Sequence, residues 1–389
     1  MKITRRCFFS ALFCLLAILP AFPQTPNQKF LAFVGTYTDK TESKGIYAYE
    51  FDTATGKLTP KGLAAETSNP SWLVIHPNGK WAYAANESGK QSTVSAFSID
   101  AKSAKLTFLN QLPALGEDPC YLSLDKTGKF LFVANYTSGN VVVFPILPNG
   151  KLGKHTALQS DQGTLGPNKE RQDTPHAHWV EAGGNNLSID ISDLGLDLIL
   201  IYSFDVDKGS IHVPDSPFVG HKSEGPYTLR LHPGTGPRHL TGYGRFLYVL
   251  GELQSTVTVF QFNRMNRYEE IQHISTLPNG FSGRNDAAEI AVHTSGKWLF
   301  ASNRGHDSIA VFAIDLSVGT LRPAGYFSTG GKEPRHFAID PTGRFLLAEN
   351  QNSNSIVVFR IDPATGALSR VSTIEGVPSP VCLTFYPAR

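Results

Sequence analysis

Apolar and polar residues alternate in a pattern that recurs along almost the whole chain. Clear copies of the pattern occupy residues 69–86 and 333–350. In each copy, a short apolar run begins just after a proline, a turn containing Gly79 or Gly343 follows, and a second apolar run ends at an asparagine. An alternating strand then follows, and the motif Asp-x-x-Thr-Gly-x-Leu opens a fourth. The pattern therefore predicts a repeating unit of four β-strands.

The starting points of the units recur about every 50 residues, which is the length of one propeller blade. The same interval separates Pro70 from Gly79 and Pro334 from Gly343. The predicted first residues of the innermost strands are Pro70, Pro119, Pro175, Pro237, Ala287, Pro334 and Pro380. Seven such anchors predict an all-β, seven-bladed β-propeller.

The two ends of the chain support the same architecture. The repeats begin in the middle of a unit, with strand patterns at 30–37 and 45–52, and they stop after a lone first strand at 380–387. The C-terminal strand is expected to join the first blade and hide two sheet edges. Residues 25–389 are thus predicted to form one closed propeller domain.

Residues 1–24 are interpreted as a signal peptide. Lys2, Arg5 and Arg6 precede an apolar run at 8–22 that is short for a bilayer span, and the segment 4–9 resembles a twin-arginine signal. The mature protein is therefore expected in the periplasm or outside the cell, without a membrane span. The formal net charge of +2 falls close to zero without this segment, which argues against nucleic acid as a partner.

Candidate chemistry gathers where the first strands begin and the second strands end, because in a propeller these points surround one mouth of the central channel. The first and second positions after each anchor are Ser71/Trp72, Cys120/Tyr121, His176/Ala177, Arg238/His239, Ala288/Glu289, Arg335/His336 and Val381/Cys382. At the third position, His178 is the exception in an otherwise apolar ring of Leu73, Leu122, Leu240, Ile290, Phe337 and Leu383.

The ends of the second strands add further polar groups to this mouth. They are Thr36, Glu87, Tyr136, Asp193, Glu252, Arg304 and Gln351, with His306 just beyond. Arginine pairs bidentately with carboxylate or phosphate, and His and Glu move protons near neutral pH. The cluster predicts an anion-binding site; the alternative interpretation is a set of hydrated polar groups at a channel opening.

Several other chemistries find no support in the sequence. It contains no G-x-S-x-G nucleophile elbow, phosphate loop or dinucleotide fingerprint. Cys120 and Cys382 are expected to be buried and unpaired. His176 and His178 would share a face of a regular strand, but no third or fourth ligand stands at suitable spacing. Neither a metal nor a cofactor is therefore expected.

Combined motifs at these positions resemble the bacterial seven-bladed lactonase family, which includes 6-phosphogluconolactonases and carboxy-cis,cis-muconate lactonizing enzymes. They are Pro175-His-Ala-His178, Asp193-Leu-Gly-Leu-Asp197, Gly236-Pro-Arg-His239, Gly251-Glu-Leu253, Ala288-Glu-Ile290, Asn303-Arg-Gly-His306 and Pro334-Arg-His336. The resemblance implies an active-site set of His176 or His178 with Arg238, Glu252 and Arg304. The neighbouring residues expected to bind substrate are His239, Glu289, His306, Arg335 and His336.

The leading functional hypothesis is a metal-independent hydrolase of an anionic sugar lactone or a related lactone. Arg238 and Arg304 would hold the anionic group and stabilise charge on the carbonyl oxygen, while Glu252 or a mouth histidine would activate water. Arg238 and Glu252 are expected to lie close together, because one starts a first strand and the other ends its antiparallel neighbour. The alternatives are a muconate-type cycloisomerase, and a non-catalytic exported propeller that binds a sugar acid or a protein.

Overall fold

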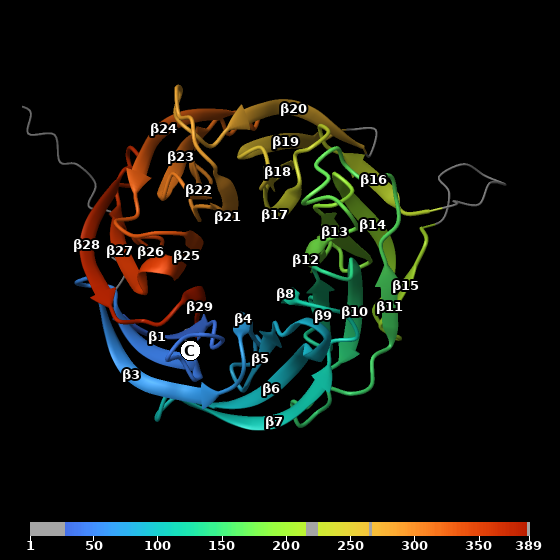
Figure 1. Cartoon of the computed structure of the whole chain (residues 1–389), viewed down its shortest axis with the longest axis vertical. Helices are drawn as coiled ribbons and strands as arrows, with labels where there is room; N and C mark the ends of the chain where they lie inside the picture. The colour runs from blue at the N-terminus through green and yellow to red at the C-terminus, as the bar shows by residue number, and fades with distance from the viewer. Residues whose placement is uncertain (1–27, 215–224, 264–266, 387–389) are drawn as a thin grey trace, which may run out of the picture.

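The fold is a ring of seven sheets around a central axis (Figure 1). The computed structural model describes residues 28–214, 225–263 and 267–386, so the predicted signal peptide lies outside the described residues. Each sheet is antiparallel, and successive strands along the chain run from the axis outward. The predicted seven-bladed β-propeller is confirmed.

Each blade contributes one strand to each of four concentric layers. The innermost strands, in blade order, are β29 (Pro380–Phe385), β4 (Pro70–Ile75), β8 (Pro119–Leu124), β12 (Ala177–Ala182), β17 (Pro237–Tyr243), β21 (Asp286–Val292) and β25 (Pro334–Ile339). The second strands are β1 (Lys29–Thr36), β5 (Trp81–Asn86), β9 (Phe130–Asn135), β13 (Ser188–Asp193), β18 (Phe246–Gly251), β22 (Trp298–Arg304) and β26 (Phe345–Asn350).

The two outer layers complete the blades. The third strands are β2 (Gly45–Asp52), β6 (Thr93–Asp100), β10 (Asn140–Pro145), β14 (Leu198–Asp205), β19 (Thr256–Phe262), β23 (Ser308–Ile314) and β27 (Ser355–Ile361). The outermost strands are β3 (Lys57–Glu66), β7 (Lys105–Pro113), β11 (Ala157–Ser160), β15 (Ser210–His212), β20 (Tyr268–Ser275), β24 (Leu321–Ser328) and β28 (Leu368–Glu375). In blade 4, β16 (Tyr227–Arg230) pairs with the first half of β14, while β15 pairs with its second half.

The C-terminal strand closes the ring, as the sequence predicted. β29 pairs antiparallel with β1, so the first blade contains both ends of the repeat region. Leu383 lies opposite Val34, and the hydroxyl of Tyr386 donates a hydrogen bond to the carbonyl of Gly79 in blade 2 at 2.8 Å. Closure removes an unpaired edge from each of two strands, which protects the backbone from edge-to-edge association.

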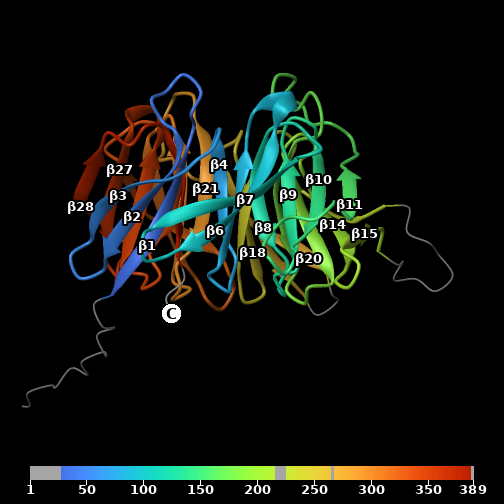
Figure 2. The ribbon, with the colours of Figure 1, turned by 90° about the horizontal axis from the view of Figure 1, so that it is seen from below.

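The hydrophobic core is divided into seven clusters in the described residues, one between each pair of neighbouring blades. Both faces of a blade are therefore apolar, which explains why most of the second strands are nearly continuous hydrophobic runs; β13, with the sequence SIDISD, is the exception. The seam between blades 1 and 7, for example, packs Val34 and Leu383 against Leu347. The strands cross the thickness of the ring between its two faces (Figure 2).

Two smaller expectations can be compared with the described residues. Cys120 and Cys382 are both buried and free, as predicted. The helices in this part of the chain are the single 3-10 turns η1 (Gly89–Gln91) and η2 (Gln351–Ser353). No described helix is long and apolar enough to cross a membrane.

Candidate active site

Each inner strand begins with a β-bulge at the same mouth of the channel. In blade 2, Pro70 lies opposite Asn86 and Trp72 opposite Ala85, so Ser71 is the extra residue. A bulge re-aims the side chain of the inserted residue. The residues at this first position are Ser71, Cys120, His178, Arg238, Ala288, Arg335 and Val381.

The prediction that Pro175 starts the inner strand of blade 4 is wrong. Ala177 pairs with Asp193 there, as Pro119 pairs with Asn135 in blade 3. The turn after this strand is also two residues later than predicted. Asn186, with a left-handed φ of 63°, occupies the turn position where other blades have glycine. Asparagine tolerates this conformation better than other non-glycine residues. The interval of nine residues between anchor and turn thus also holds in blade 4, and blade 5, where Gly244 follows Pro237 by seven, is the exception.

This shift changes the place of His178. It is not an exception in the apolar third ring, where Val180 stands instead, but occupies the bulge position beside Arg238 and Arg335. The prediction that His176 and His178 share one strand face is also wrong, since His176 precedes β12 and His178 is bulged.

The prediction that Thr36 and Asp193 reach the mouth of the channel at the ends of second strands is wrong. Thr36 pairs with Pro380 and Asp193 with Ala177 inside their sheets, and both side chains are fully buried. The next residues, Tyr37 and Leu194, occupy the loop position that Glu87 and Glu252 have in other blades. The backbone N–H at this position donates a hydrogen bond to the carbonyl of the residue before the inner strand.

An inner cavity of about 200 Å³ opens between the bulges and the strand ends. Its lining residues come from six blades and one long loop, and they are Glu87, Cys120, Tyr136, Arg171, His178, Glu252, Arg304 and Arg335. Four residues predicted for the active site or for binding, namely His178, Glu252, Arg304 and Arg335, are therefore brought together.

Three arginines converge on the buried carboxylate of Glu252. Arg171 hydrogen-bonds Oε1, while Arg238 Nε lies 3.0 Å and Arg304 Nη2 lies 3.2 Å from Oε2. The predicted closeness of Arg238 and Glu252 is confirmed. Although burial opposes ionisation, the three guanidinium groups lower the pKa of Glu252 to about 2. Glu252 is therefore a permanent anion whose two oxygens are both already paired.

Arg171 was missed by the sequence analysis because it lies outside the repeat, in the loop between β11 and β12. The loop is fixed by the buried Gln172, whose amide donates a hydrogen bond to the carbonyl of Leu194 at 2.9 Å. Asn168 accepts the backbone N–H of Arg171 at 3.2 Å. The unusual length of this crossover, with charged residues at 169–171 and 173, was the available signal.

Glu87 forms the opposite wall of the inner cavity. Its Oε2 accepts a hydrogen bond from the hydroxyl of Tyr37 at 2.9 Å and lies 3.7 Å from Arg335 Nη2. The Arg335 guanidinium also lies over the Tyr37 ring at 5.4 Å from its centre.

Burial and the neighbouring arginines lower the pKa of Arg238 to about 10, so this side chain remains charged at neutral pH.

A layer of rings closes the channel beneath the cavity. Trp72 lies 5.3 Å from the rings of both His239 and His336, and 4.4 Å from Tyr121. These residues follow the bulge position in their strands, so they form the floor of the site. Three predicted binding residues, His239, His336 and Glu289, thus do not line the cavity.

Buried carboxyl groups hold the floor histidines in place. His239 Nδ1 lies 3.1 Å from Glu289 Oε2, and His336 Nδ1 lies 2.7 Å from Glu349 Oε2. Burial raises the pKa of both glutamates and lowers that of His336 to about 4, which favours neutral partners. Glu349 was not predicted, because its position reads as part of a buried second strand.

The remaining predicted histidines have different surroundings. His178 contacts the rings of Tyr136 and His239, and neither of its ring nitrogens has a hydrogen-bond partner on another described residue. Burial, followed by the charge of Arg238, lowers its pKa well below the usual value. His176 stacks on Tyr136, and its two nitrogens face the Tyr136 carbonyl and Asp173.

His306 does not join the cavity, although it was predicted to bind substrate. Its Nδ1 contacts the hydroxyl of Ser308 at 2.7 Å, and its ring lies against Phe281.

Among the described residues, the group of side chains close enough to share a metal ion is His232, Glu270 and His273, on the outer side of blade 5. No such group includes His176 or His178. Burial raises the pKa of Cys120, so its thiol is not activated as a nucleophile.

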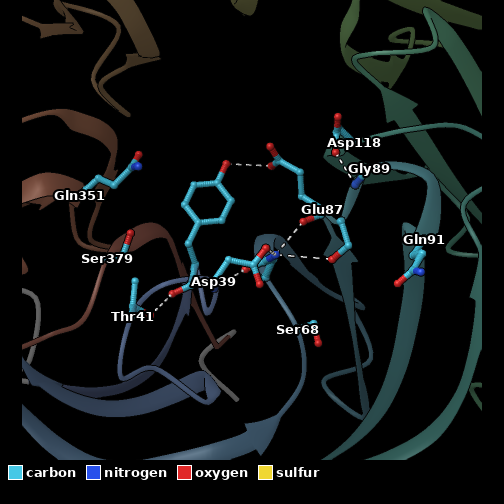
Figure 3. A pocket seen from close by; sticks show the side chains of 12 residues that line it. Asp39, Thr41, Ser68, Glu87, Gly89, Gln91, Asp118, Gln351 and Ser379 are labelled. Carbon is cyan, nitrogen blue, oxygen red and sulfur yellow. Dashed lines mark hydrogen bonds between the residues drawn. The ribbon is translucent and has the colours of Figure 1, made fainter.

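A wider outer pocket of about 660 Å³ adjoins the inner cavity, and Glu87 lines both. It is bordered by loops of blades 1, 2, 3 and 7, and Figure 3 shows several of its side chains. Its lining residues are Tyr37, Asp39, Thr41, Ser68, Asn69, Glu87, Ser88, Gly89, Gln91, Asp118, Gln351 and Ser379.

Comparison with known proteins identifies the family. The family described as "Lactonase, 7-bladed beta-propeller" matches residues 31–385. The chain belongs to this family. The 6-phosphogluconolactonase of Bacillus subtilis is 34% identical over 360 residues, covering 92% of this chain and 98% of the relative. The structure of a periplasmic gluconolactonase of Pseudomonas aeruginosa, PpgL, is 33% identical with a TM-score of 0.84, covering 92% of this chain and 99% of that one.

A second curated relative gives the same picture within this lactonase family. The 6-phosphogluconolactonase of Formosa agariphila is 34% identical over 317 residues, which cover 78% of this chain and 85% of the relative. The matched span of the family contains every residue of the inner cavity.

Proposed function

We propose that the inner cavity hydrolyses a sugar lactone by direct attack of water, with His178 as the general base. The protein is a lactone hydrolase, the activity stated in the names of its Bacillus, Formosa and Pseudomonas relatives. The observation that carries the assignment of the base is the position of His178. This neutral imidazole lies in the cavity wall, and its nitrogens have no partner on another described residue.

Glu252 serves this mechanism better as an anchor than as a base. A general base needs a free acceptor atom within reach of the attacking water. Each of its oxygens is already held by arginine. Its role is to keep Arg171, Arg238 and Arg304 in position around the substrate. His176 is a weaker candidate, since both of its nitrogens already face acceptors.

The proposed reaction conserves every proton. A ring nitrogen of His178 takes a proton from water as the oxygen attacks the lactone carbonyl carbon. The carbonyl oxygen becomes negative and is stabilised by Arg304 and Arg335. The ring C–O bond then breaks, and the leaving alkoxide takes the proton from the imidazolium. The product is a hydroxy acid, whose carboxyl group releases its proton to solvent and lies as a carboxylate among the guanidinium groups.

The charge of the site supports an acid as product. Four guanidinium groups, from Arg171, Arg238, Arg304 and Arg335, face the carboxylates of Glu87, Glu252 and Asp286. The excess positive charge attracts a carboxylate and favours the developing oxyanion. The negative charge that the arginines bind is thus the charge that forms on the lactone carbonyl group during hydrolysis and stays on the carboxylate of the product.

A panel of lactones tests this function. Purified enzyme is expected to accelerate the opening of glucono-1,5-lactone above its spontaneous rate, with equal activity before and after dialysis against a chelator. The equal activity is expected because all the proposed roles belong to side chains of the cavity. Zinc-dependent recovery of activity would contradict the metal-independent mechanism, and turnover of muconates alone would favour the cycloisomerase.

Glu252→Gln distinguishes an anchor from a base. The pKa of Glu252 is depressed from 4.5 to about 2 in the folded state, so its ionisation adds on the order of 3 kcal/mol to stability above pH 4.5. This contribution disappears as the pH falls from 4.5 through about 2. Denaturant unfolding is therefore expected to show a less stable variant at pH 7, with the difference narrowing towards pH 3.

A different result would return Glu252 to the role of base. If the variant kept wild-type stability at every pH but lost turnover, its charge would matter for proton transfer alone. Exposed Glu170→Gln, in the same loop as Arg171, is a matched control that should alter neither quantity.

We also propose that the protein is exported, on the basis of the basic and apolar segment at residues 1–24. Sequencing the N-terminus of protein recovered from the periplasm or medium tests this; a mature chain that still begins at Met1 in the cytoplasm would contradict it.

A further inference from the structure

The outer pocket differs in chemistry from the inner cavity that it adjoins. None of its twelve lining residues is Lys, Arg or His, whereas the inner cavity contains three arginines and a histidine. Asp39 and Asp118 give the outer pocket a negative character, so it repels a phosphate or carboxylate. The mouth therefore has a cationic side, where the chemistry occurs, and an uncharged to acidic side.

The polar groups of the outer pocket fall into two sets. Asn69 and Asp118 are structural: Asn69 Oδ1 accepts the N–H of Thr38 at 2.7 Å, and Asp118 Oδ1 accepts the N–H of Gly89 at 2.7 Å. The side chains of Gln91, Gln351 and Ser68, in contrast, make no hydrogen bond to any described residue. Each amide offers both donors and an acceptor, which suits neighbouring hydroxyl groups of a sugar.

The free amides stand on opposite sides of the pocket. Figure 3 shows Gln351 with Ser379 on one side, and Gln91 with Gly89 and Asp118 on the other. Gln351 follows β26 in blade 7, while Gln91 ends η1 in blade 2. A ligand held between them would lie next to Glu87, which also borders the inner cavity.

The volumes of the two spaces favour a substrate longer than one sugar ring. Ligand pockets typically enclose about 300–1,000 Å³. The inner cavity, at about 200 Å³, is smaller than this range, while the outer pocket, at about 660 Å³, lies within it. A single lactone ring in the inner cavity would leave the larger space unused.

We propose that the outer pocket is a subsite for a neutral, hydroxyl-rich sugar unit attached to the lactone, so that the preferred substrate is the lactone of an oxidised di- or oligosaccharide. This inference rests on the proposed function of the inner cavity. The lactone ring lies among the arginines, and the next sugar passes Glu87 and hydrogen-bonds Gln91 and Gln351. A distal phosphate finds no cation in this pocket.

Kinetics with three substrates test the subsite. The value of kcat/KM for cellobiono-1,5-lactone is expected to exceed that for glucono-1,5-lactone at least tenfold, since each added neutral hydrogen bond contributes roughly fivefold. In the double variant Gln91→Ala/Gln351→Ala this advantage should fall to less than threefold, with glucono-1,5-lactone turnover unchanged. Gln159→Ala, on the outer strand β11, is the matched control and should retain the full advantage.

The outcomes separate this inference from the proposed function. Hydrolysis of glucono-1,5-lactone without preference for the disaccharide lactone, or a preference for 6-phosphoglucono-1,5-lactone over it, would overturn the subsite and leave the lactonase intact. If no lactone were hydrolysed, the proposed function would fail, and calorimetry with cellobionate and gluconate would decide the subsite. Tighter binding of cellobionate, lost in the double variant, would support it; equal affinities would overturn it.

Discussion

Replacing His178 with glutamine is expected to lower kcat for lactone hydrolysis by about 10²- to 10⁴-fold, with little change in KM. Glutamine preserves polarity and approximate size but cannot accept and return a proton. The arginines that hold the substrate keep their ion pairs with Glu252, because His178 makes no contact with that carboxylate. The loss should therefore affect the chemical step rather than binding.

The pH profile gives a second measure of the same residue. Burial and the charge of Arg238 lower the pKa of His178, so the ring stays neutral to well below pH 6.5. Wild-type kcat/KM should remain level from neutral pH into the mildly acidic range and then fall as the ring gains a proton. The acid limb assigned to His178 should be absent from the residual activity of His178→Gln.

His306→Gln is the matched control for this experiment. His306 comes from the same mouth motifs, yet its ring lies against Phe281 and outside the cavity. Its substitution should change kcat less than about threefold, as expected for a group that makes no contact with the reacting atoms. A His178→Gln enzyme with wild-type kcat would exclude His178 as the base and return that role to His176 or Glu252.

Repetition made the fold predictable. Seven copies of one hydrophobic pattern reveal the blades, and the incomplete first and last copies reveal the closure, because a sheet edge left open is unfavourable. Aligning blade 4 with the other repeats, however, predicted the wrong strand position for His178. Pro175 matches the prolines of other anchors, but the pairing of Ala177 with Asp193 starts the strand, and only the left-handed Asn186 marks the displaced turn.

The parts of the site that were missed lie outside what a repeat can encode. Arg171 comes from a crossover loop, whose path is set by the hydrogen bonds of Asn168 and Gln172 rather than by strand periodicity. Glu349 was overlooked for the opposite reason: it occupies a fully buried strand position, where its partner His336 comes from the neighbouring strand. Cross-strand partners of this kind follow from register, and a shift of one residue changes them all.

Deletion of residues 378–389 should have the largest effect on the fold itself. The truncation removes β29, which exposes the edge of β1 along Ala32–Thr36 and opens the seam between blades 1 and 7. Val381, Cys382 and Leu383 are each less than 5% exposed in the intact ring. Each buried apolar side chain of this size contributes about 1.5–3 kcal/mol, so several together approach the whole stability of a typical domain.

The expected result is a protein that aggregates on expression and shows no cooperative thermal unfolding. A rearranged chain provides the matched control, because β29 and β1 are antiparallel neighbours: residues 378–386 placed before Lys29 through a short glycine-rich turn can form the same pair as a hairpin. This variant should recover solubility and a cooperative transition, since it contains the same strand and only the connection of that strand differs. A soluble truncation with an unchanged thermal midpoint would show that β29 does not hold the ring closed.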